Sequence, residues 1–232
     1  MNGLDYTTRY NGNMPMLSPA ENEKLKTFKI CIVGCGSLGG HVANMLARMG
    51  VGEITIIDGG KFSVSDLNWQ VFCTEDSIGE FKAQAAKDRI SVINSDVKIN
   101  AIIENLTEKN KCELIAGHDI VIDAQDNMSV RRNIYRACEM TGLTMVHGAF
   151  SGWFGQVSTM PPGDETFEKI YPDAADRGSE AELGSPPFTP AFVASLQAAE
   201  AVKVLLRKGV PLTKRRLTVD LLLMDFEVFN YK

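Results

Sequence analysis

Cysteine is sparse in this sequence, and it lacks the spacing that binding and redox motifs require. No two cysteines stand in a C-x-x-C arrangement, which a zinc knuckle or a thioredoxin-type pair would need. We therefore expect no zinc, and reduced, mostly buried thiols in a cytoplasmic protein. The cysteines are Cys31, Cys35, Cys73, Cys112 and Cys138.

Positive charge and long apolar runs are also scarce. Lys and Arg number 24 against 29 Asp and Glu, and the net charge of −5 argues against nucleic acid as the main partner, because phosphate binding needs a basic face. No apolar run reaches the length that spans a bilayer, and the polar N-terminus shows no secretory signal. We expect no nucleic acid and no membrane, but a small-molecule or protein partner. The histidines give no metal-ligand spacing: His41, His118 and His147.

Glycine is concentrated in one early turn. Lys29–Val33 is a short apolar, β-branched run typical of a buried parallel strand, and 41–49 has helical spacing. Gly34, Gly36 and Gly39 stand between them at G-x-G-x-x-G spacing. In a dinucleotide fold these glycines allow the tight turn, the approach of a phosphate to backbone N–H groups, and close helix–strand packing. The alternative is a glycine turn that binds no ligand.

Strand-like and helix-like segments alternate through the first 150 residues, which predicts an α/β fold with a doubly wound, mostly parallel Rossmann-like sheet. Later segments predict antiparallel strands that extend the sheet in the C-terminal part. We expect one domain over 1–232, with an N-terminal arm at 1–20 and a long surface loop at 161–190. The expected strands are 29–33, 53–57, 98–103, 118–123, 144–148, 155–160, 217–223 and 227–231, and the expected helices are 19–27 (capped by Ser18), 41–49, 77–93, 113–116, 127–141 and 191–208.

Several charged residues fall at the carboxyl ends of the expected strands, where open α/β sheets bind ligands. Asp58 ends the second strand and is placed to accept from a ribose hydroxyl. Lys82 follows the next loop, and Asp123 and Asp126 follow the strand 118–123. A nucleoside triphosphate needs a cation at its phosphates and a carboxylate for Mg²⁺, roles that Lys82 and Asp126 fit.

Each of these assignments has a purely structural alternative. Lys82 could be a solvated helix lysine, and Asp126 could cap the helix 127–141. For the other polar residues we predict structural roles. We expect a solvated helix face, a strand-end residue and a packed polar spot in an apolar helix, formed respectively by Arg131, Arg132 and Arg136, by His147, and by Gln197 with Glu200.

From about Arg9 to its end, the sequence resembles the HesA/MoeB/ThiF family, bacterial relatives of ubiquitin-activating enzymes. The resemblance rests on IVGCGSLGG, VGEITIID, SDLNWQ, GEFKAQAA, the D-x-x-D-N run ending at Asn127, and SLQAAEAVKVLL. It implies an eight-stranded, largely parallel sheet in a homodimer. It also implies adenylyltransferase activity: ATP-dependent adenylation of the C-terminal glycine carboxylate of a small ubiquitin-like sulfur carrier. That carrier, of the ThiS or MoaD type with a C-terminal Gly-Gly, serves thiamin, molybdopterin or related sulfur transfer.

The resemblance assigns roles to individual positions. Lys82 and Asp126 would be catalytic, with Lys82 on the phosphates and Asp126 on Mg²⁺, and Asp58 would hold the ribose. The ATP-binding residues implied are Gly34, Gly36, Gly39, Asp58, Asp66, Lys82, Asp126 and Asn127.

The sequence also departs from the family pattern. In the loop that usually reads S-N-L-x-R-Q, Asp66 replaces the Asn and Trp69 replaces the phosphate-binding Arg. Gly12 replaces the second Arg of R-Y-x-R, which in the family reaches the ATP of a neighbouring subunit. These changes should weaken triphosphate binding. The family's zinc cysteines and its crossover-loop cysteine are absent, so we expect no transfer of the carrier to an enzyme thiol.

Three alternatives to adenylation remain open. Trp69 and Asp66 favour a catalytically weakened or non-catalytic relative that binds a ubiquitin-like carrier or a partner subunit, whereas Lys82 and Asp126 argue against it. A nicotinamide-dependent oxidoreductase could use the same glycine turn, but it has no need of Lys82 or the D-x-x-D-N run. A tRNA-modifying dehydratase of the same family is disfavoured by the low basic content.

Overall fold

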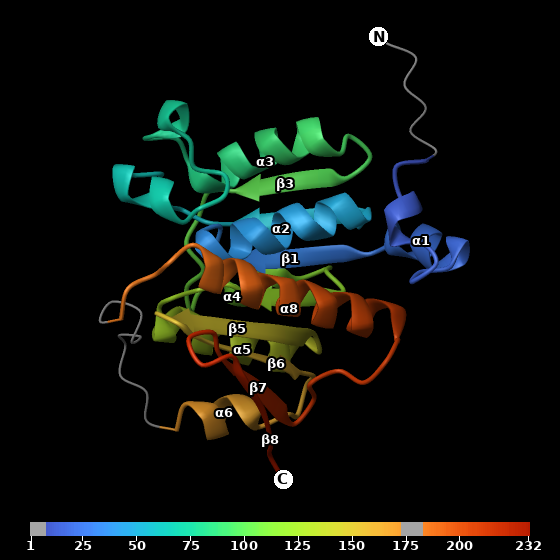
Figure 1. The fold of residues 1–232 in the computed structure, drawn as a ribbon, viewed down its shortest axis with the longest axis vertical. Helices are drawn as coiled ribbons and strands as arrows, with labels where there is room; N and C mark the ends of the chain where they lie inside the picture. The colour runs from blue at the N-terminus through green and yellow to red at the C-terminus, as the bar shows by residue number, and fades with distance from the viewer. Residues whose placement is uncertain (1–7, 173–182) are drawn as a thin grey trace.

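The computed structural model describes residues 8–172 and 183–232, whose strands form one sheet in the order β3-β2-β1-β4-β5-β6-β7-β8. The strands from β3 to β5 are parallel, and β6, β7 and β8 continue the sheet antiparallel (Figure 1). This confirms the predicted fold class. The strands are β1 Lys29–Val33, β2 Glu53–Ile57, β3 Lys98–Ile102, β4 Ile120–Asp123, β5 Thr144–Ser151, β6 Phe154–Met160, β7 Arg215–Asp220 and β8 Asp225–Asn230.

Helices cover both faces of the parallel part of the sheet, with α2, α3 and α8 on one face and α4 and α5 on the other (Figure 1). Alternate residues of β1 join different cores: Ile30 and Ile32 pack with α2 and α8, whereas Cys31 and Val33 pack with α5. Burial on both faces explains why this strand is a continuous apolar run. The helices are α1 Pro19–Leu25, α2 Ser37–Met49, α3 Lys82–Ile93, α4 Lys111–Ile115, α5 Met128–Thr141, α6 Thr166–Ile170 and α8 Phe188–Leu206.

The direction of strand order reverses beside β1. The chain runs outward from β1 to β2 and β3, then returns to add β4 and β5 on the other side. The carboxyl ends of β1 and β4 therefore form the topological switch point at which open α/β sheets bind ligands.

The helix predicted at 77–93 starts later than expected. It begins at Lys82, and residues 75–77 form a separate 3₁₀ turn. Gly79 has a φ of +87°, which a helix cannot continue through, and Phe81 forms a β-bridge with Lys61. The correct start places Lys82 in the first turn of α3, directly after a loop.

Helix α8 is the one described helix that is long and apolar enough to cross a membrane, contrary to the expectation of no such run. In the structure 61% of its apolar window is buried, against α2, β5 and β6, as in the core helix of a globular fold. Gln197 and Glu200 are buried and hydrogen-bonded, as predicted for a packed polar spot in this helix. Gln197 donates to the carbonyls of Asp123 and Val146, and Glu200 accepts from Thr159.

The predicted arm and surface loop are only partly described, since 1–7 and 173–182 lie outside the described residues. The remainder of the arm packs on the body: Leu17 is buried, and Arg9 pairs with Asp96 at 2.9 Å. Ser18 caps α1 in a capping box with Glu21, as predicted. The described part of the 161–190 loop contains α6.

Candidate active site

A cavity of about 720 Å³ opens at the carboxyl ends of β1, β2 and β4. It lies at the switch point, and its walls include every predicted site residue except Gly39, which lies behind the turn. The predicted residues in its lining are Gly34, Gly36, Asp58, Asp66, Lys82, Asp126 and Asn127.

The three glycines of the turn differ in whether the structure has room for a side chain at their position. Gly34 has a φ of +100°, and a Cβ there would lie 2.5 Å from the carbonyl oxygen of Ala124. A Cβ on Gly39 would overlap the carbonyl oxygen of Gly34. A Cβ on Gly36 would meet nothing closer than 3.8 Å, the side chain of Gln70. The fold therefore needs Gly34 and Gly39, whereas the bare backbone at Gly36 leaves open space beside the cavity.

The N-terminus of α2 faces this space without a side-chain cap. Its Ncap residue is Gly36, and Ser37 and Leu38 also line the cavity. The first N–H groups of a helix have no partner within the helix, and the helix dipole makes this end positive. The turn thus offers backbone donors and positive potential to an anion such as phosphate.

Asp58 is held firmly at the end of β2. One carboxylate oxygen accepts from the backbone N–H of Cys35 at 2.7 Å, and the other from the N–H of Gly60 at 2.7 Å. Each oxygen keeps a further lone pair, so the carboxylate can accept from a ribose hydroxyl without losing these bonds.

Asp66 and Lys82 form an ion pair in the cavity wall, with 3.7 Å between Lys82 Nζ and Asp66 Oδ2. Asp66 also accepts from the Ser63 N–H at 2.8 Å and from Gln70 Nε2 at 2.5 Å. Burial raises the pKa of the Asp66 carboxyl, but the bonds from Ser63 and the charge of Lys82 outweigh it and lower the pKa overall. Asp66 is therefore a carboxylate at neutral pH. It stabilises its own loop through Ser63 and Gln70, and it pairs with the Lys82 ammonium.

Trp69 belongs to the wall of the cavity and does not fill it. Its indole N–H helps to lower the pKa of Asp66, although no acceptor in the described chain meets hydrogen-bond geometry with it. The half-buried ring presents an aromatic surface where the family motif carries a cation.

Asn127, not Asp126, caps α5. Asn127 Oδ1 accepts from the N–H groups of Ser129 at 2.9 Å and Val130 at 3.1 Å, so the capping alternative for Asp126 is wrong. The Asp126 side chain is exposed in the cavity and makes no hydrogen bond or ion pair with any residue that the structure describes. A free carboxylate of this kind fits Mg²⁺, which proteins often hold through one or two carboxylates plus the phosphates of the substrate.

Within the described ranges, no group of three or more His, Cys, Asp or Glu side chains could hold a metal by itself. The thiols beside the turn are also poor nucleophiles. Burial raises the pKa of Cys31 and Cys35 well above the usual range, so both remain protonated at neutral pH.

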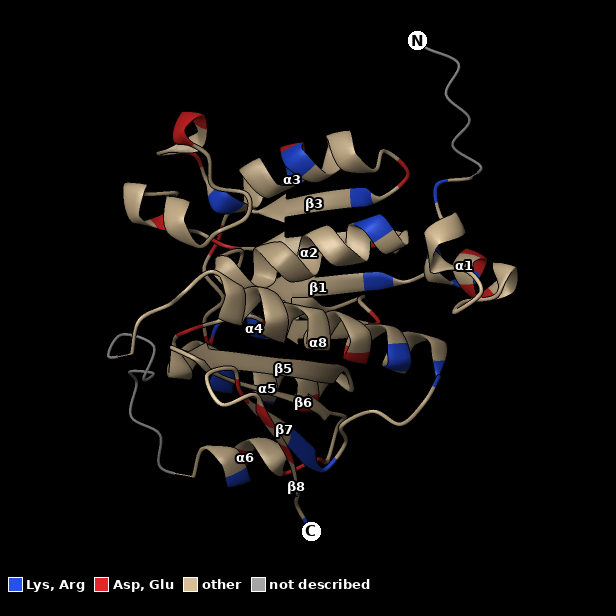
Figure 2. Cartoon of the chain, in the orientation of Figure 1, with Lys and Arg blue, Asp and Glu red and all other residues tan. Residues whose placement is uncertain are grey.

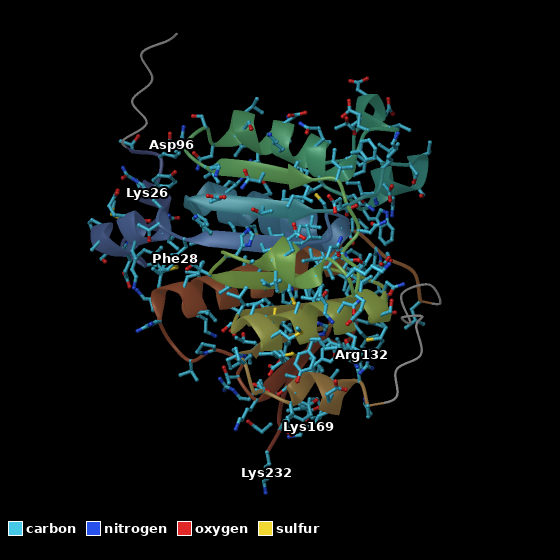
Figure 3. The ribbon with its side chains drawn as sticks, turned by 180° about the vertical axis from the view of Figure 1, so that it is seen from behind. Lys26, Phe28, Asp96, Arg132, Lys169 and Lys232 are labelled. Carbon is cyan, nitrogen blue, oxygen red and sulfur yellow. The ribbon has the colours of Figure 1, made fainter. Side chains whose placement is uncertain are left out.

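Of the three arginines predicted on a solvated helix face, Arg136 is exposed as expected, whereas Arg131 and Arg132 are engaged by other residues. Arg131 is buried in the cavity wall, donating from Nε to the carbonyl of Gln125 at 2.6 Å. Arg132 points toward α6, where it pairs with Glu168 at 3.0 Å (Figure 3). Arg9 is far from the cavity, because its partner Asp96 lies at the opposite end of the strands (Figure 3). Of these arginines, Arg131 is the one that lines the cavity.

His147 was expected at a strand end but lies within β5, fully buried. Residues outside the predicted site also line the cavity. Glu104 and Asn105 follow β3, so the rule that selected Asp58 would have selected them too. Phe150 and Gln70 also line the cavity, but neither directly follows a parallel strand, so that rule would not have selected them.

Acidic and basic residues are interspersed over the described chain, and many lie at strand ends and on outward helix faces (Figure 2). The described residues that line the cavity are more acidic than basic. The charged ones among them are Asp58, Asp66, Glu104, Asp126, Lys82 and Arg131.

Residues 10–232 match the ThiF family. The chain is similar to the sulfur carrier protein adenylyltransferase of Thermus thermophilus, with 34% identity over 232 residues, 94% of this chain and 84% of the relative. It is also similar to the SAMP-activating enzyme E1 of Haloferax volcanii, with 32% identity over 97% of this chain and 85% of the relative. The molybdopterin-synthase adenylyltransferase of Salmonella typhimurium is 30% identical over 88% of this chain and 83% of the relative.

Solved structures share the fold at lower identity. Escherichia coli MccB with ATP superposes with a TM-score of 0.81 at 21% identity, covering 97% of this chain and 71% of MccB. PaaA gives a TM-score of 0.81 at 21% identity, covering 99% of this chain and 74% of PaaA.

Proposed function

Because the chain belongs to the ThiF family and is an adenylyltransferase of the ThiF/MoeB type, we propose that it uses ATP to adenylate the C-terminal glycine carboxylate of a small ubiquitin-like sulfur carrier. The carrier would end in Gly-Gly and serve thiamin, molybdopterin or related sulfur transfer. We place the reaction in the cytoplasm and the enzyme in a homodimer, as the resemblance implies.

The observation that carries this proposal is the composition of one cavity. The open Gly36 turn and the α2 N-terminus can receive phosphates, Asp58 can hold the ribose, and Lys82 lies within reach of the same space. The unpartnered Asp126 fits a Mg²⁺ ion bound with the phosphates. A nicotinamide enzyme would need no such carboxylate.

The chemistry needs no protein nucleophile. The glycine carboxylate attacks the α-phosphorus of ATP, the new C–O–P bond gives an acyl adenylate, and pyrophosphate leaves with the pair of electrons from the broken P–O bond. Lys82 and the helix N-terminus hold the two anions together and offset their repulsion. When bound, Mg²⁺ neutralises part of the charge that builds up on the leaving pyrophosphate.

The direct test is ATP–pyrophosphate exchange with purified protein and a carrier ending in Gly-Gly. We expect exchange that depends on the carrier and disappears when the carrier's terminal carboxylate is amidated. ATP binding without exchange would support a non-catalytic, carrier-binding relative. Binding of NADH but not ATP would support an oxidoreductase instead.

We place the carrier on the exposed apolar surface of the β7–β8 hairpin. Isolated exposed apolar residues are ordinary, but a contiguous group marks an interaction surface. This hairpin surface comprises Leu222, Leu223 and Met224 between the two strands, with Phe226 and Val228 on one face of β8, and these side chains are 44% to 75% exposed. Strand β8 is also the free edge of the sheet, where a partner can dock.

Replacing Leu223 with Asp should raise the KM for the carrier about tenfold, because burying the new charge costs about 1.4 kcal/mol or more. The KM for ATP should not change. Val92→Asp is the matched control, because Val92 is 78% exposed on the distant helix α3. An unchanged carrier KM with an altered sedimentation coefficient would instead assign the hairpin surface to a second copy of the chain.

A further inference from the structure

A buried polar network lies directly behind the turn that carries Asp126. At its centre the fully buried His147 contacts Asp123 Oδ2 through Nδ1 at 2.7 Å and the Tyr171 hydroxyl through Nε2 at 3.0 Å. The Tyr171 hydroxyl also receives bonds from Gln156 Nε2 and from Arg131 Nη1, the latter at 3.2 Å. Residues from β4, β5, β6 and α5, and the residue directly after α6, therefore meet in one place.

The contacts described above fix which atoms of His147 and Tyr171 donate and which accept. A carboxylate can only accept, so His147 Nδ1 carries the proton and Nε2 is left to accept from the tyrosine hydroxyl. The hydroxyl then donates to His147 and accepts from Gln156 and Arg131. Burial lowers the pKa of His147 more than the bond to Asp123 raises it, and the charges of Arg131 and Arg216 lower it further. The neutral imidazole that this pattern requires is thus the favoured form.

The network holds both backbone groups of Gln125, the residue before Asp126. The Gln125 N–H donates to Asp123 Oδ1 at 3.1 Å, and its carbonyl accepts from Arg131 Nε at 2.6 Å. Asp123 is in turn fixed by His147, and Arg131 by the Tyr171 hydroxyl. The Asp126 side chain has no polar contact of its own among the described residues, so the direction in which it points depends on this backbone clamp.

We propose that Tyr171 and His147 are positioning residues that aim the Asp126 carboxylate at the Mg²⁺–nucleotide complex. The proposal rests on the proposed function, because it assigns Asp126 to that ion. The Tyr171 hydroxyl is linked to Gln125 by two hydrogen bonds through Arg131 and by three through His147 and Asp123. Loss of the hydroxyl would loosen both holds on Gln125 without removing any group that touches the ligand.

The test compares Tyr171→Phe with Tyr135→Phe. Tyr135 belongs to the same aromatic cluster, stacked on Phe167 at 4.7 Å, but its hydroxyl donates to the Asp164 carbonyl outside the network. Nucleotide binding would be measured by calorimetry with ATP alone and with ATP plus Mg²⁺. We expect Tyr171→Phe to weaken binding about tenfold only when Mg²⁺ is present, in the range of losses seen when a residue behind a metal ligand is changed. Tyr135→Phe should bind as the wild type does in both conditions.

A second variant keeps the test valid if Tyr171→Phe melts at a much lower temperature. His147→Asn keeps an N–H for Asp123, and should retain more Mg²⁺-dependent binding than His147→Leu, which leaves Asp123 without that donor. Equal losses with and without Mg²⁺, or no loss in Tyr171→Phe, would overturn the positioning role. Wild-type protein that binds no ATP in either condition would overturn the proposed function itself.

Discussion

Replacing Lys82 with Ala should lower kcat/KM for ATP–pyrophosphate exchange by about 10²–10³-fold, which corresponds to about 2.7–4 kcal/mol of transition-state stabilisation. The expected loss is large because the cavity contains few cations. Among the described residues that line it, Lys82 and Arg131 are the basic ones. Arg131 is engaged by Gln125 and Tyr171, so Lys82 is the cation best placed to reach a phosphate.

The Asp66 ion pair sets how Lys82 behaves before the nucleotide arrives. Lys82 Nζ lies 3.7 Å from Asp66 Oδ2, longer than a direct hydrogen bond, so the ammonium retains donors for a ligand. Its side chain is 17% exposed and opens to the cavity. Asp66 therefore holds the Lys82 ammonium in place, while its own negative charge weakens the attraction for phosphate.

Lys87→Ala is the matched control, because Lys87 also belongs to α3 but does not line the cavity. It removes the same charge from the same helix, so a general electrostatic effect would appear in both variants. Melting temperatures of both proteins show whether either change disturbs the fold. Exchange by Lys82→Ala within about threefold of Lys87→Ala would contradict the phosphate-binding role.

The sequence was sufficient to predict the sheet and the glycine turn, because both depend on local patterns. Residues 30–33 of β1 are all apolar because the strand is buried on both faces, and this pattern is visible without any tertiary contact. Gly34 and Gly39 are required by backbone geometry within a few residues of themselves and by the strand beside them. Asp58 was found because it follows a strand, and all parallel strands end at one edge.

The roles of Arg131 and His147 could not be predicted, because their partners are distant in the sequence. Arg131 looks like one of several surface arginines until Tyr171, 40 residues away, is placed beside it. His147 is buried because β5 continues past the predicted end at 148 to Ser151, paired with β6. The spacing of neighbouring residues in the sequence does not reveal these long-range contacts. The helix cap was easier to locate, because the observed cap at Asn127 is one position from the alternative at Asp126.

The start of α3 shows a different limit. Apolar residues at intervals of three and four continue from Ile78 into the true helix, so periodicity alone predicts an earlier start. The positive φ at Gly79 and the bridge of Phe81 to Lys61 override that pattern. Because the helix begins at Lys82, the lysine projects from a first turn beside the cavity instead of from the middle of a solvated helix.

The second large effect is expected at Asp126. Asp126→Asn keeps the shape of the side chain but removes its charge, so Mg²⁺ should bind far less tightly with the nucleotide. We expect kcat/KM for exchange to fall by about 10²-fold, or about 2.7 kcal/mol, at a Mg²⁺ concentration that saturates the wild type. Asp76→Asn serves as the control, because Asp76 is an exposed carboxylate that does not line the cavity.

A change of metal preference separates coordination by Asp126 from a general loss of negative charge. Asp126→Cys replaces a hard oxygen ligand with a thiolate, which favours softer ions. Exchange by this variant should be poor with Mg²⁺ and should recover in part with Cd²⁺, whereas Asp126→Asn should not recover. If Cd²⁺ restores neither variant and Asp126→Asn retains the Mg²⁺ dependence of the wild type, Asp126 does not hold the ion. In that case the clamp on Gln125 would serve only to hold the turn between β4 and α5.

Because Tyr171→Phe acts through the direction of the same carboxylate, it should reproduce the Mg²⁺ dependence of Asp126→Asn in weaker form.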